Sequence, residues 1–584
     1  MRSVPEPNRP VTPDAGAADP ASADVMTPAT PPMSRRQARE ARAARRQLQH
    51  GGIKAIAVFL VSLLILGTCG RVVYGMIIDH HAPLDLGGFN AGGSVTIGVV
   101  GAPSSLDIRK AGSTTADGTA TNGTATTGGT NGINTDTGST AVQQALLGNV
   151  YESLLSLDER NTAQPGVADS YAVSGDGLTY TFTINAGKTF SNGDALDADD
   201  VVWSLQQTIG NHYAQADRLT GLKSVTANGA NTVTVTLSQP NPDLPWLLAG
   251  PTGIVYDKDA KYSYDTTAIG SGPFTVQSWE NGTSLTLKAN GRYWGQKAKT
   301  GTVTLKYYGD DAAAVAALGR GDVDAITPVA ESQRTALSRV DGVSVRQGDS
   351  THRIVLGFNN GTDSILSDKR YRQGIRYAID RTALANALVG GSGSRTLGGP
   401  FTPLEPGYED LNALFPHSSE KATDLLAYFF YVSHRRTLTF VYPSRYGTQV
   451  GELLKQQLQP MNVDLDVKAV DDATWRQTVQ EKKQYDFTLF DMDDSHDLAT
   501  LMDSGNFIGY ESPAVQALWA SAQKAGTASA YETAMKRLAR QISDDSPVDW
   551  LCERRPLTAQ REGVTGLPAT MTDRRLPLAD VTKG

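Results

Sequence analysis

The chain has few cysteines, few aromatic residues and almost no long hydrophobic runs. Of its 584 residues only Cys69 and Cys552 are cysteines, which excludes a disulfide framework and a cysteine-based zinc site. Aromatic residues make up 7% and charged residues 20%, and with 58 glycines this composition argues against a coiled coil or a nucleic-acid binder. Only one apolar stretch approaches membrane-spanning length, which excludes a polytopic membrane protein. The composition therefore favours a Gly- and Thr-rich α/β or α+β protein with one candidate anchor.

That candidate anchor lies near the N-terminus, at residues 55–78. Residues 1–54 read as a disordered basic tail, with seven basic residues against one acid between Ser34 and Lys54. A basic flank before an apolar run keeps the N-terminus in the cytoplasm, so the rest of the chain should lie outside. Residues 79–93 then form a linker.

Two interpretations of residues 55–78 remain open. The helix is either retained as a single-pass anchor or cleaved as a signal, and LGTC, ending at Cys69, resembles a lipoprotein box with a lipidated cysteine. Mass spectrometry of the mature N-terminus distinguishes the two. In both cases we expect the bulk of the chain on the extracytoplasmic side of the cell membrane.

Beyond the linker, hydrophobic periodicity alternates between strand and helix patterns, which predicts an α/β (mixed α+β) fold. Strands are expected at 94–100, 178–184, 232–237, 437–442, 463–470 and 486–490. Helical spacing occurs at 141–157, 312–318, 370–388, 450–458 and 514–542. Residues 112–140 form a Gly/Thr-rich run without core-forming side chains, which predicts a solvated loop.

Several motifs in this part occur in an order that resembles one known family. They include NVYESLLSLD, DGLTYTFTI, FSNGDALDADDVVWSL, GSGPFTV, RYWG and DKRYRQGIRYAIDR. Asp–Gly before an alternating strand is typical of a hairpin turn, and Asp197 before VVWSL is typical of a helix N-cap. Together the motifs are similar to those of the family 5 extracellular solute-binding proteins, the peptide-binding components of ABC importers. The likeness runs from about Ser94 to the C-terminus.

The resemblance implies a bilobed clamp of the periplasmic-binding-protein type, with an additional domain in the first lobe and the N-terminal transmembrane or signal helix before it. The expected domain bounds are 94–148, 269–345 and 553–584 for lobe I, 149–268 for additional domain II, and 346–552 for lobe II. Ligand would bind between the lobes, which close by hinge rotation.

The resemblance also implies ligand-binding residues. Asp494 lies where peptide-binding members have the aspartate that binds a ligand ammonium group, and Asp491 replaces the family tryptophan three residues earlier. Arg445 lies where dipeptide-binding members have a carboxylate-binding arginine. Gly112, Ser113 and Thr114 correspond to backbone that pairs with peptide. For the acidic run around Asp494, an anionic pocket and a solvated loop both remain open.

No sequence motif predicts catalysis. The chain has no G-x-S-x-G, H-E-x-x-H, G-x-x-x-x-G-K-[ST] or G-x-G-x-x-G pattern, so we expect no enzyme, catalytic residue, metal site or cofactor. The function implied is capture of a peptide or other small solute by a monomer that works with an ABC permease and ATPase. The alternatives are a membrane-tethered sensor or regulator, and a binder of an oligosaccharide or metal complex.

Overall fold

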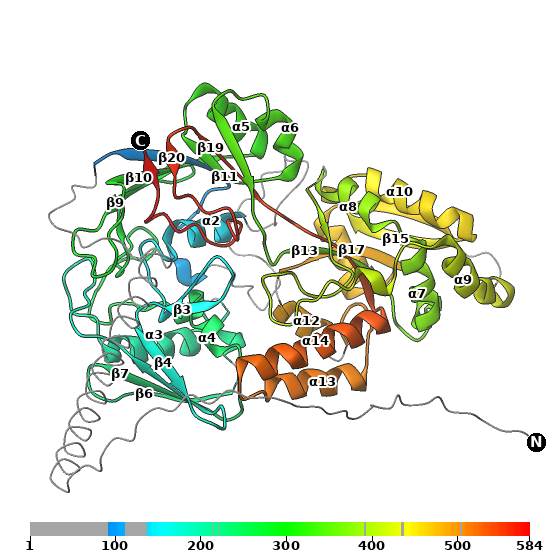
Figure 1. Cartoon of the computed structure of the whole chain (residues 1–584), viewed down its shortest axis with the longest axis horizontal. Coiled ribbons are helices and arrows are strands. Elements are labelled where there is room, and N and C mark those ends of the chain that lie inside the picture. Colours follow the sequence, from blue (N-terminus) through cyan, green and yellow to red (C-terminus); the bar gives the residue numbers. More distant parts are fainter. Residues whose placement is uncertain are drawn as a thin grey trace, which may run out of the picture. The chain divides into compact units, whose positions relative to one another are not determined.

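The computed structural model describes residues 92–110, 137–213, 215–219, 221–390, 393–433, 437–493, 495–502 and 505–584 (Figure 1). The predicted tail, the anchor with Cys69, most of the linker and most of the Gly/Thr-rich loop lie outside these residues. Among the described helices none is both long and apolar enough to cross a membrane.

Lobe I is built on a seven-stranded sheet with the order β12-β19-β11-β1-β10-β9-β8. Its strands are β1 (Ser94–Val100), β8 (Phe274–Glu280), β9 (Ser284–Ala289), β10 (Thr302–Tyr308), β11 (Ala325–Val329), β12 (Val343–Gln347) and β19 (Leu557–Arg561). The helices α2 (Thr137–Leu146), α5 (Asp311–Arg320) and α6 (Arg334–Leu337) and the short pair β20 (Val564–Thr565) and β21 (Thr582–Lys583) complete it. The sheet thus combines segments from both ends of the described chain.

A smaller unit, here named the insert domain, lies between β1 and β8 in the chain. Its four-stranded antiparallel sheet has the order β4-β5-β7-β6. Its elements are β4 (Ser170–Val173), β5 (Thr179–Thr183), β6 (Leu222–Ala227), β7 (Thr232–Leu237), α3 (Ala198–Gly210), α4 (Leu244–Leu247) and the nearby pair β2 (Leu155–Leu157) and β3 (Ala163–Pro165). The predicted N-cap is confirmed: Asp197 accepts from the amides of Asp199 and Asp200, in a capping box with Asp200.

Lobe II is built on a six-stranded sheet with the order β14-β18-β13-β17-β15-β16. Its strands are β13 (Arg353–Phe358), β14 (Arg395–Thr396), β15 (Thr437–Pro443), β16 (Asp464–Val470), β17 (Phe487–Met492) and β18 (Val548–Glu553). Its helices are α7 (Lys369–Ala378), α8 (Arg381–Val389), α9 (Ser419–Ser433), α10 (Gln449–Leu458), α11 (Asp472–Trp475), α12 (Ser495–Met502), α13 (Pro513–Gln523) and α14 (Ala528–Asp545).

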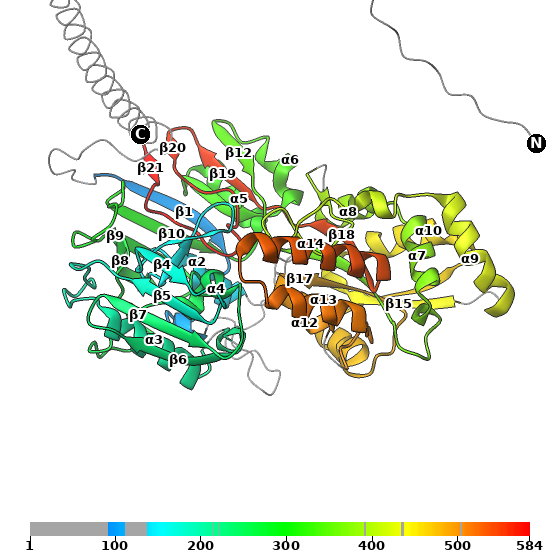
Figure 2. The ribbon, with the colours of Figure 1, turned by 60° about the horizontal axis from the view of Figure 1, so that its bottom comes forward.

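The lobe II sheet is buried on both faces, which explains its nearly unbroken apolar strands. Along β13, Ile354 and Leu356 belong to one hydrophobic cluster, which includes side chains of α7, α8 and α10. Val355, which points to the other face, belongs to a second cluster with side chains of α13 and α14. Helices therefore cover both faces of this sheet (Figures 1 and 2).

Three predicted helices are wrong in extent. The helix expected at 141–157 is α2 and ends at Leu146, because the chain turns at Gly148 with a φ of 73° and then forms β2. The pattern at 370–388 is two helices, since Asp380 caps a new helix by accepting from the amide of Ala383. The pattern at 514–542 is likewise divided into α13 and α14, where Thr527 is the N-cap.

Three of the family-like motifs meet at Glu152, near the junction of lobe I and the insert domain. Its carboxylate accepts hydrogen bonds from the Tyr293 hydroxyl at 2.6 Å and the Ser271 hydroxyl at 3.3 Å. A side chain at Gly270 would lie 2.0 Å from the carbonyl oxygen of Val150, so only glycine fits there. Tyr293 is half-buried in this contact.

We expect Glu152 to make stability depend on pH. Burial raises its pKa from 4.5 to about 7 against the lowering effect of Tyr293, Ser271 and Lys188. Between these values the folded chain holds a proton that the unfolded chain has released, so stability falls as the pH rises. Glu152→Gln should reduce this pH dependence by up to roughly 3 kcal/mol in urea unfolding. Glu532→Gln, on the exposed side of α14, should leave it unchanged, and equal curves for both variants would contradict the prediction.

The arginine-rich motif of α7 and α8 fixes these helices to the sheet of lobe II. The buried carboxylate of Asp549 on β18 accepts from Arg376 at 2.8 Å and from Arg381 at 2.8 and 3.0 Å. Arg372 donates to the backbone carbonyls of Asp545 and Ser546, both at 2.8 Å, at the end of α14. The three arginines are spaced to reach one strand and the turn before it.

Asp549→Asn should destabilise the chain by about 3–5 kcal/mol, because it leaves two buried guanidinium groups without a full negative charge. Asp544→Asn is the matched control, since Asp544 is also paired, with Lys369, but is 56% exposed. It should cost less than about 1 kcal/mol. Similar midpoints for both variants in chemical denaturation would show that the Asp549 network contributes little.

Candidate functional site

Two antiparallel segments connect lobe I with lobe II. β12 continues into β13 through residues 348–352, and β18 continues into β19 through residues 554–556. The amide of Gly348 donates to the carbonyl of Pro556 at 3.0 Å, and the amide of Arg554 donates to that of His352 at 2.8 Å. These two segments, here named the interlobe ribbon, therefore hold their side chains in fixed places between the lobes.

A polar cluster lies beside the ribbon, with the carboxylate of Asp491 at its centre. Asp491 is on β17, which pairs with β13. Its oxygens lie 3.2 Å from Arg554 Nε and 3.2 Å from His352 Nε2. They also accept a hydrogen bond from the Tyr446 hydroxyl at 2.8 Å, and Arg445 lies 3.4 Å away. Four side chains from three segments thus converge on one carboxylate.

The electrostatics of the cluster keep Asp491 ionised. Burial alone would raise the pKa of its carboxyl, but Arg554, His352 and Arg445 lower it far below its usual value. Burial and the charge of Asp491 raise the pKa of Tyr446 well above its usual value, so its hydroxyl remains a donor. The negative charge is therefore compensated within the protein.

Arg445 bridges two carboxylates. It follows β15 in a 3-10 turn, Ser444–Tyr446, and pairs with Asp472 of α11 as well as with Asp491. Its guanidinium carbon lies 4.8 Å from the ring centre of Tyr446. Because a guanidinium donates in several directions in its plane, one arginine can fix two acids from different elements.

The cluster also reaches lobe I. Arg574, in the C-terminal segment that packs into lobe I, pairs with Asp493 at 3.1 Å. The other ring nitrogen of His352, Nδ1, lies 3.6 Å from the carboxylate of Asp493. The imidazole therefore has Asp491 next to one ring nitrogen and Asp493 next to the other. The ion pair between Asp493 and Arg574 therefore joins the two lobes next to the ribbon.

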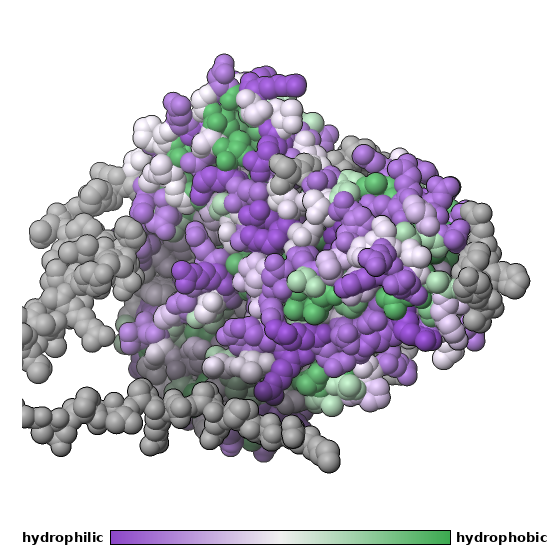
Figure 3. All heavy atoms as spheres, turned by 45° about the vertical axis from the view of Figure 1, so that its right-hand side comes forward, coloured by the Kyte–Doolittle hydropathy of each residue, from purple (hydrophilic) through white to green (hydrophobic). Residues whose placement is uncertain are grey.

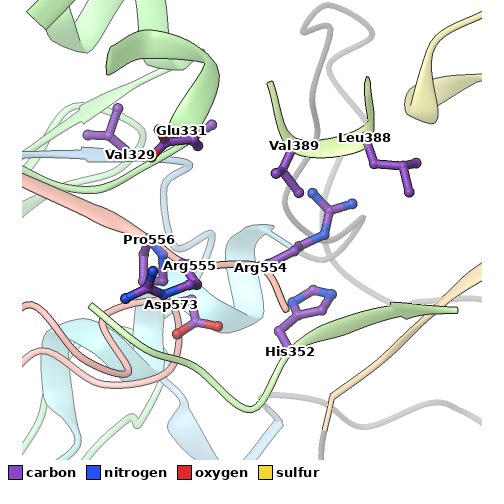
Figure 4. A pocket seen from close by; sticks show the side chains of 10 residues that line it. Val329, Glu331, His352, Leu388, Val389, Arg554, Arg555, Pro556 and Asp573 are labelled. Carbon is purple, nitrogen blue, oxygen red and sulfur yellow. The ribbon is translucent and has the colours of Figure 1, made fainter. Parts of the chain in front are cut away.

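A pocket opens between the lobes at this place (Figure 4). It holds about 460 Å³ of empty space, and this figure includes space that is open to solvent. Val329 and Glu331 of lobe I line one side, and Leu388–Val389 at the end of α8 line the other. Arg554 and His352 contribute from the ribbon. The pocket is thus formed by both lobes and has charged and apolar walls.

Of the predicted site residues, the structure brings Arg445 and Asp491 together. Asp494, Gly112, Ser113, Thr114 and Cys69 lie outside the described residues, and no contact tests any of these predictions. Among the described residues, no three His, Cys, Asp or Glu side chains gather as a metal site would require.

Sequence reasoning missed His352, Arg554 and Arg574. His352 and Arg554 lie close to the bounds expected for lobe II, 346 and 552. A basic residue near a crossing between the lobes was therefore the signal that the sequence offered. Arg574 had no such signal in the sequence.

Two lobes on separate sheets, a two-segment connection and a charged pocket between them define a two-lobed binding protein of the periplasmic type. The sequence profile described as bacterial extracellular solute-binding proteins, family 5, middle part, matches residues 162–504. The chain belongs to this family, as its motifs predicted.

Known proteins agree with this assignment. The chain is 23% identical to the oligopeptide-binding protein AppA of Bacillus subtilis over 71% of its own length and 82% of that protein. It is 25% identical to the glutathione-binding protein GsiB of Salmonella paratyphi A over 59% and 68%. In structure it resembles the ABC transporter substrate-binding protein CtaP of Listeria monocytogenes, with a TM-score of 0.71, 21% identity, and 85% and 100% of the two chains covered.

Asp491→Asn should destabilise the folded chain by about 3 kcal/mol, because Arg445 and Arg554 would lose the charge that compensates them. Asp472→Asn is the control, since Asp472 also pairs with Arg445 but its side chain is 43% exposed. Its cost should stay below about 1 kcal/mol. Urea unfolding measures both, and a small, equal loss would mean that Asp491 behaves as a solvated carboxylate.

Proposed function

We propose that this chain is the solute-binding component of an ABC importer, and that it captures a peptide-like solute between its lobes and delivers it to a membrane permease. The observation that carries the proposal is the pocket at the ribbon, which both lobes line and which has charged side chains from lobe I and from the ribbon. A peptide offers ammonium, carboxylate and amide groups, and such a pocket can bind all three. The relatives named as oligopeptide- and glutathione-binding support this ligand class.

In this proposal the ribbon is the hinge. Rotation of the lobes about two short segments would open the pocket while each sheet stays intact. Contacts between the lobes, such as the ion pair of Asp493 with Arg574, then form only in the closed state. A solute that contacts both lobes favours closure by its difference in affinity for the two states. The protein binds its solute without changing it and needs no cofactor.

This proposal includes the expected domain bounds, with the tail at 1–54 and the anchor at 55–78, and the expected partners. The family is described as extracellular, which supports a position of this chain outside the cytoplasmic membrane. Its proposed partners there are the permease and ATPase of the importer. We propose a monomer, which the face in Figure 3 supports: it is mostly hydrophilic, with hydrophobic side chains in small, separate patches.

Short peptides should raise the melting temperature of the purified chain, whereas oligosaccharides and nickel–histidine complexes should not. A ligand at a hundredfold excess over its Kd stabilises the folded state by about 2.7 kcal/mol. Thermal-shift screening against the three classes measures this directly. Stabilisation by an oligosaccharide or a metal complex, but by no peptide, would replace the proposed ligand class.

A further inference from the structure

One buried carboxyl oxygen in the wall of the pocket at the ribbon has no hydrogen-bond partner among the described residues. It belongs to Asp573, which lines the pocket together with His352 and Arg554 and comes from the C-terminal segment of lobe I (Figure 4). The residue is 8% exposed, and its Oδ1 atom is buried and accepts no hydrogen bond. Buried polar groups in folded proteins nearly always have a partner, so this oxygen requires an explanation.

The other charged side chains of this pocket already have partners of opposite charge. These pairs are Arg554 with Asp491 at 3.2 Å, Arg555 with Asp349 at 2.9 Å, and Glu331 with Arg334 at 2.8 Å. His352 has Asp491 next to one ring nitrogen and Asp493 next to the other. Among the described side chains that line the pocket, Asp573 is therefore the acid that lacks an ion pair.

The turn that carries Asp573 is fixed by backbone contacts on both sides. The amide of Met571 donates to the carbonyl of Asp349 in the ribbon at 2.8 Å. The side-chain amide of Gln144 of α2 donates to the carbonyl of Thr572. Met571 has a φ of 59°, a left-handed conformation that is uncommon for any residue except glycine. Such conformations are concentrated at binding sites, where the surrounding structure holds a group in place.

Burial raises the pKa of Asp573 above its usual value, although the charges of Arg574 and His352 lower it. The titratable and charged groups around it are Arg554, Arg555, His352 and Glu331 of the pocket and Arg574 with its partner Asp493. Each of these cations is next to another acid, so none of them neutralises Asp573 fully. A positive group of a solute in the pocket would stabilise the ionised carboxylate and displace its proton.

We propose that Asp573 is a solute-binding residue of lobe I, and that it accepts a positively charged nitrogen donor of the solute, which replaces the proton of its carboxyl group. The proton is released to solvent. This rests on the proposed function, because it takes the pocket at the ribbon as the solute site. The resemblance implied an ammonium-binding role for Asp494 of lobe II, whereas Asp573 is an acid on the opposite lobe. The inference adds that solute binding depends on pH.

The test compares three peptides by calorimetry with the full chain: trialanine, with an α-ammonium group; N-acetyl-alanyl-lysyl-alanine, with a side-chain ammonium group; and N-acetyl-trialanine, with neither. At least one cationic peptide should bind about tenfold or more tightly than N-acetyl-trialanine, and its identity shows the source of the cation. Asp573→Asn should remove this difference. Asp580→Asn is the control, since Asp580 lies in the same C-terminal segment but is 61% exposed and pairs with Lys299, and it should leave the difference unchanged.

Two further readouts distinguish solute binding from a structural role. The affinity for the cationic peptide should rise between about pH 4 and pH 6, because Asp573 must lose its proton to bind a cation, and Asp573→Asn should remove this rise. Asp573→Asn should also raise the melting temperature of the ligand-free chain at neutral pH, because it removes a buried charge that has no ion pair. An aspartate with a structural role would give a lower melting temperature.

The outcomes separate this inference from the proposed function. If peptides bind, but Asp573→Asn weakens cationic and uncharged peptides equally or weakens neither, Asp573 does not bind the solute, and the proposed function stands. Equal affinities of the unaltered chain for all three peptides, or a lower melting temperature of the variant, would also overturn the inference. If no peptide binds, the proposed function fails and the role of Asp573 with it.

Discussion

The interlobe ribbon is the constraint on which the rest of this structure depends. It is formed by two short stretches that lie about 200 residues apart in the sequence. Each stretch joins a strand of the lobe I sheet to a strand of the lobe II sheet. Backbone pairing keeps the stretches in register, and the buried carboxylate of Glu553 accepts from the amide of Ser350 at 2.9 Å and from Arg395 at 2.7 Å. Because both sheets continue through it, the ribbon can bend but cannot slide. The ion pairs of the candidate site lie directly beside the ribbon.

The family-like motifs form buried polar contacts that hold the elements around the ribbon. Glu152, Ser271 and Tyr293 join the chain before the insert domain to the chain after it, so the insert can be added without moving the lobe I sheet. The arginines of α7 and α8 reach Asp549 on β18, the strand that leads into the ribbon. Both networks compensate buried charge with hydrogen bonds, which costs free energy whenever one partner is missing.

Local patterns predicted most of the fold. Alternating segments such as Thr232–Leu237 were recognised because one face of the strand is buried and the other is not. The helix errors arose where a cap interrupts a pattern that continues on the same face: Asp380 starts α8 close to where α7 ends, and both helices pack on the same core. Hydrophobic periodicity shows which face of a segment is buried. It does not show a two-residue break between two helices that are buried on the same face. The lobes themselves could be predicted only through the resemblance, since strands of one sheet come from distant parts of the chain.

The site was harder to predict because the sequence does not show which cations lie next to a given acid in the folded chain. The run DMDDSHD suggested either an anionic pocket or a solvated loop, since its acids have no basic neighbours nearby in the sequence. In the structure the cations come from elsewhere: Arg554 and His352 approach Asp491 from the ribbon, and Arg574 reaches Asp493 from lobe I. Among the described residues around the ribbon, the acids and arginines nearly balance, so net charge there cannot select a solute by its total charge. The acids of this run are therefore held in ion pairs that fix the position of each charge beside the ribbon.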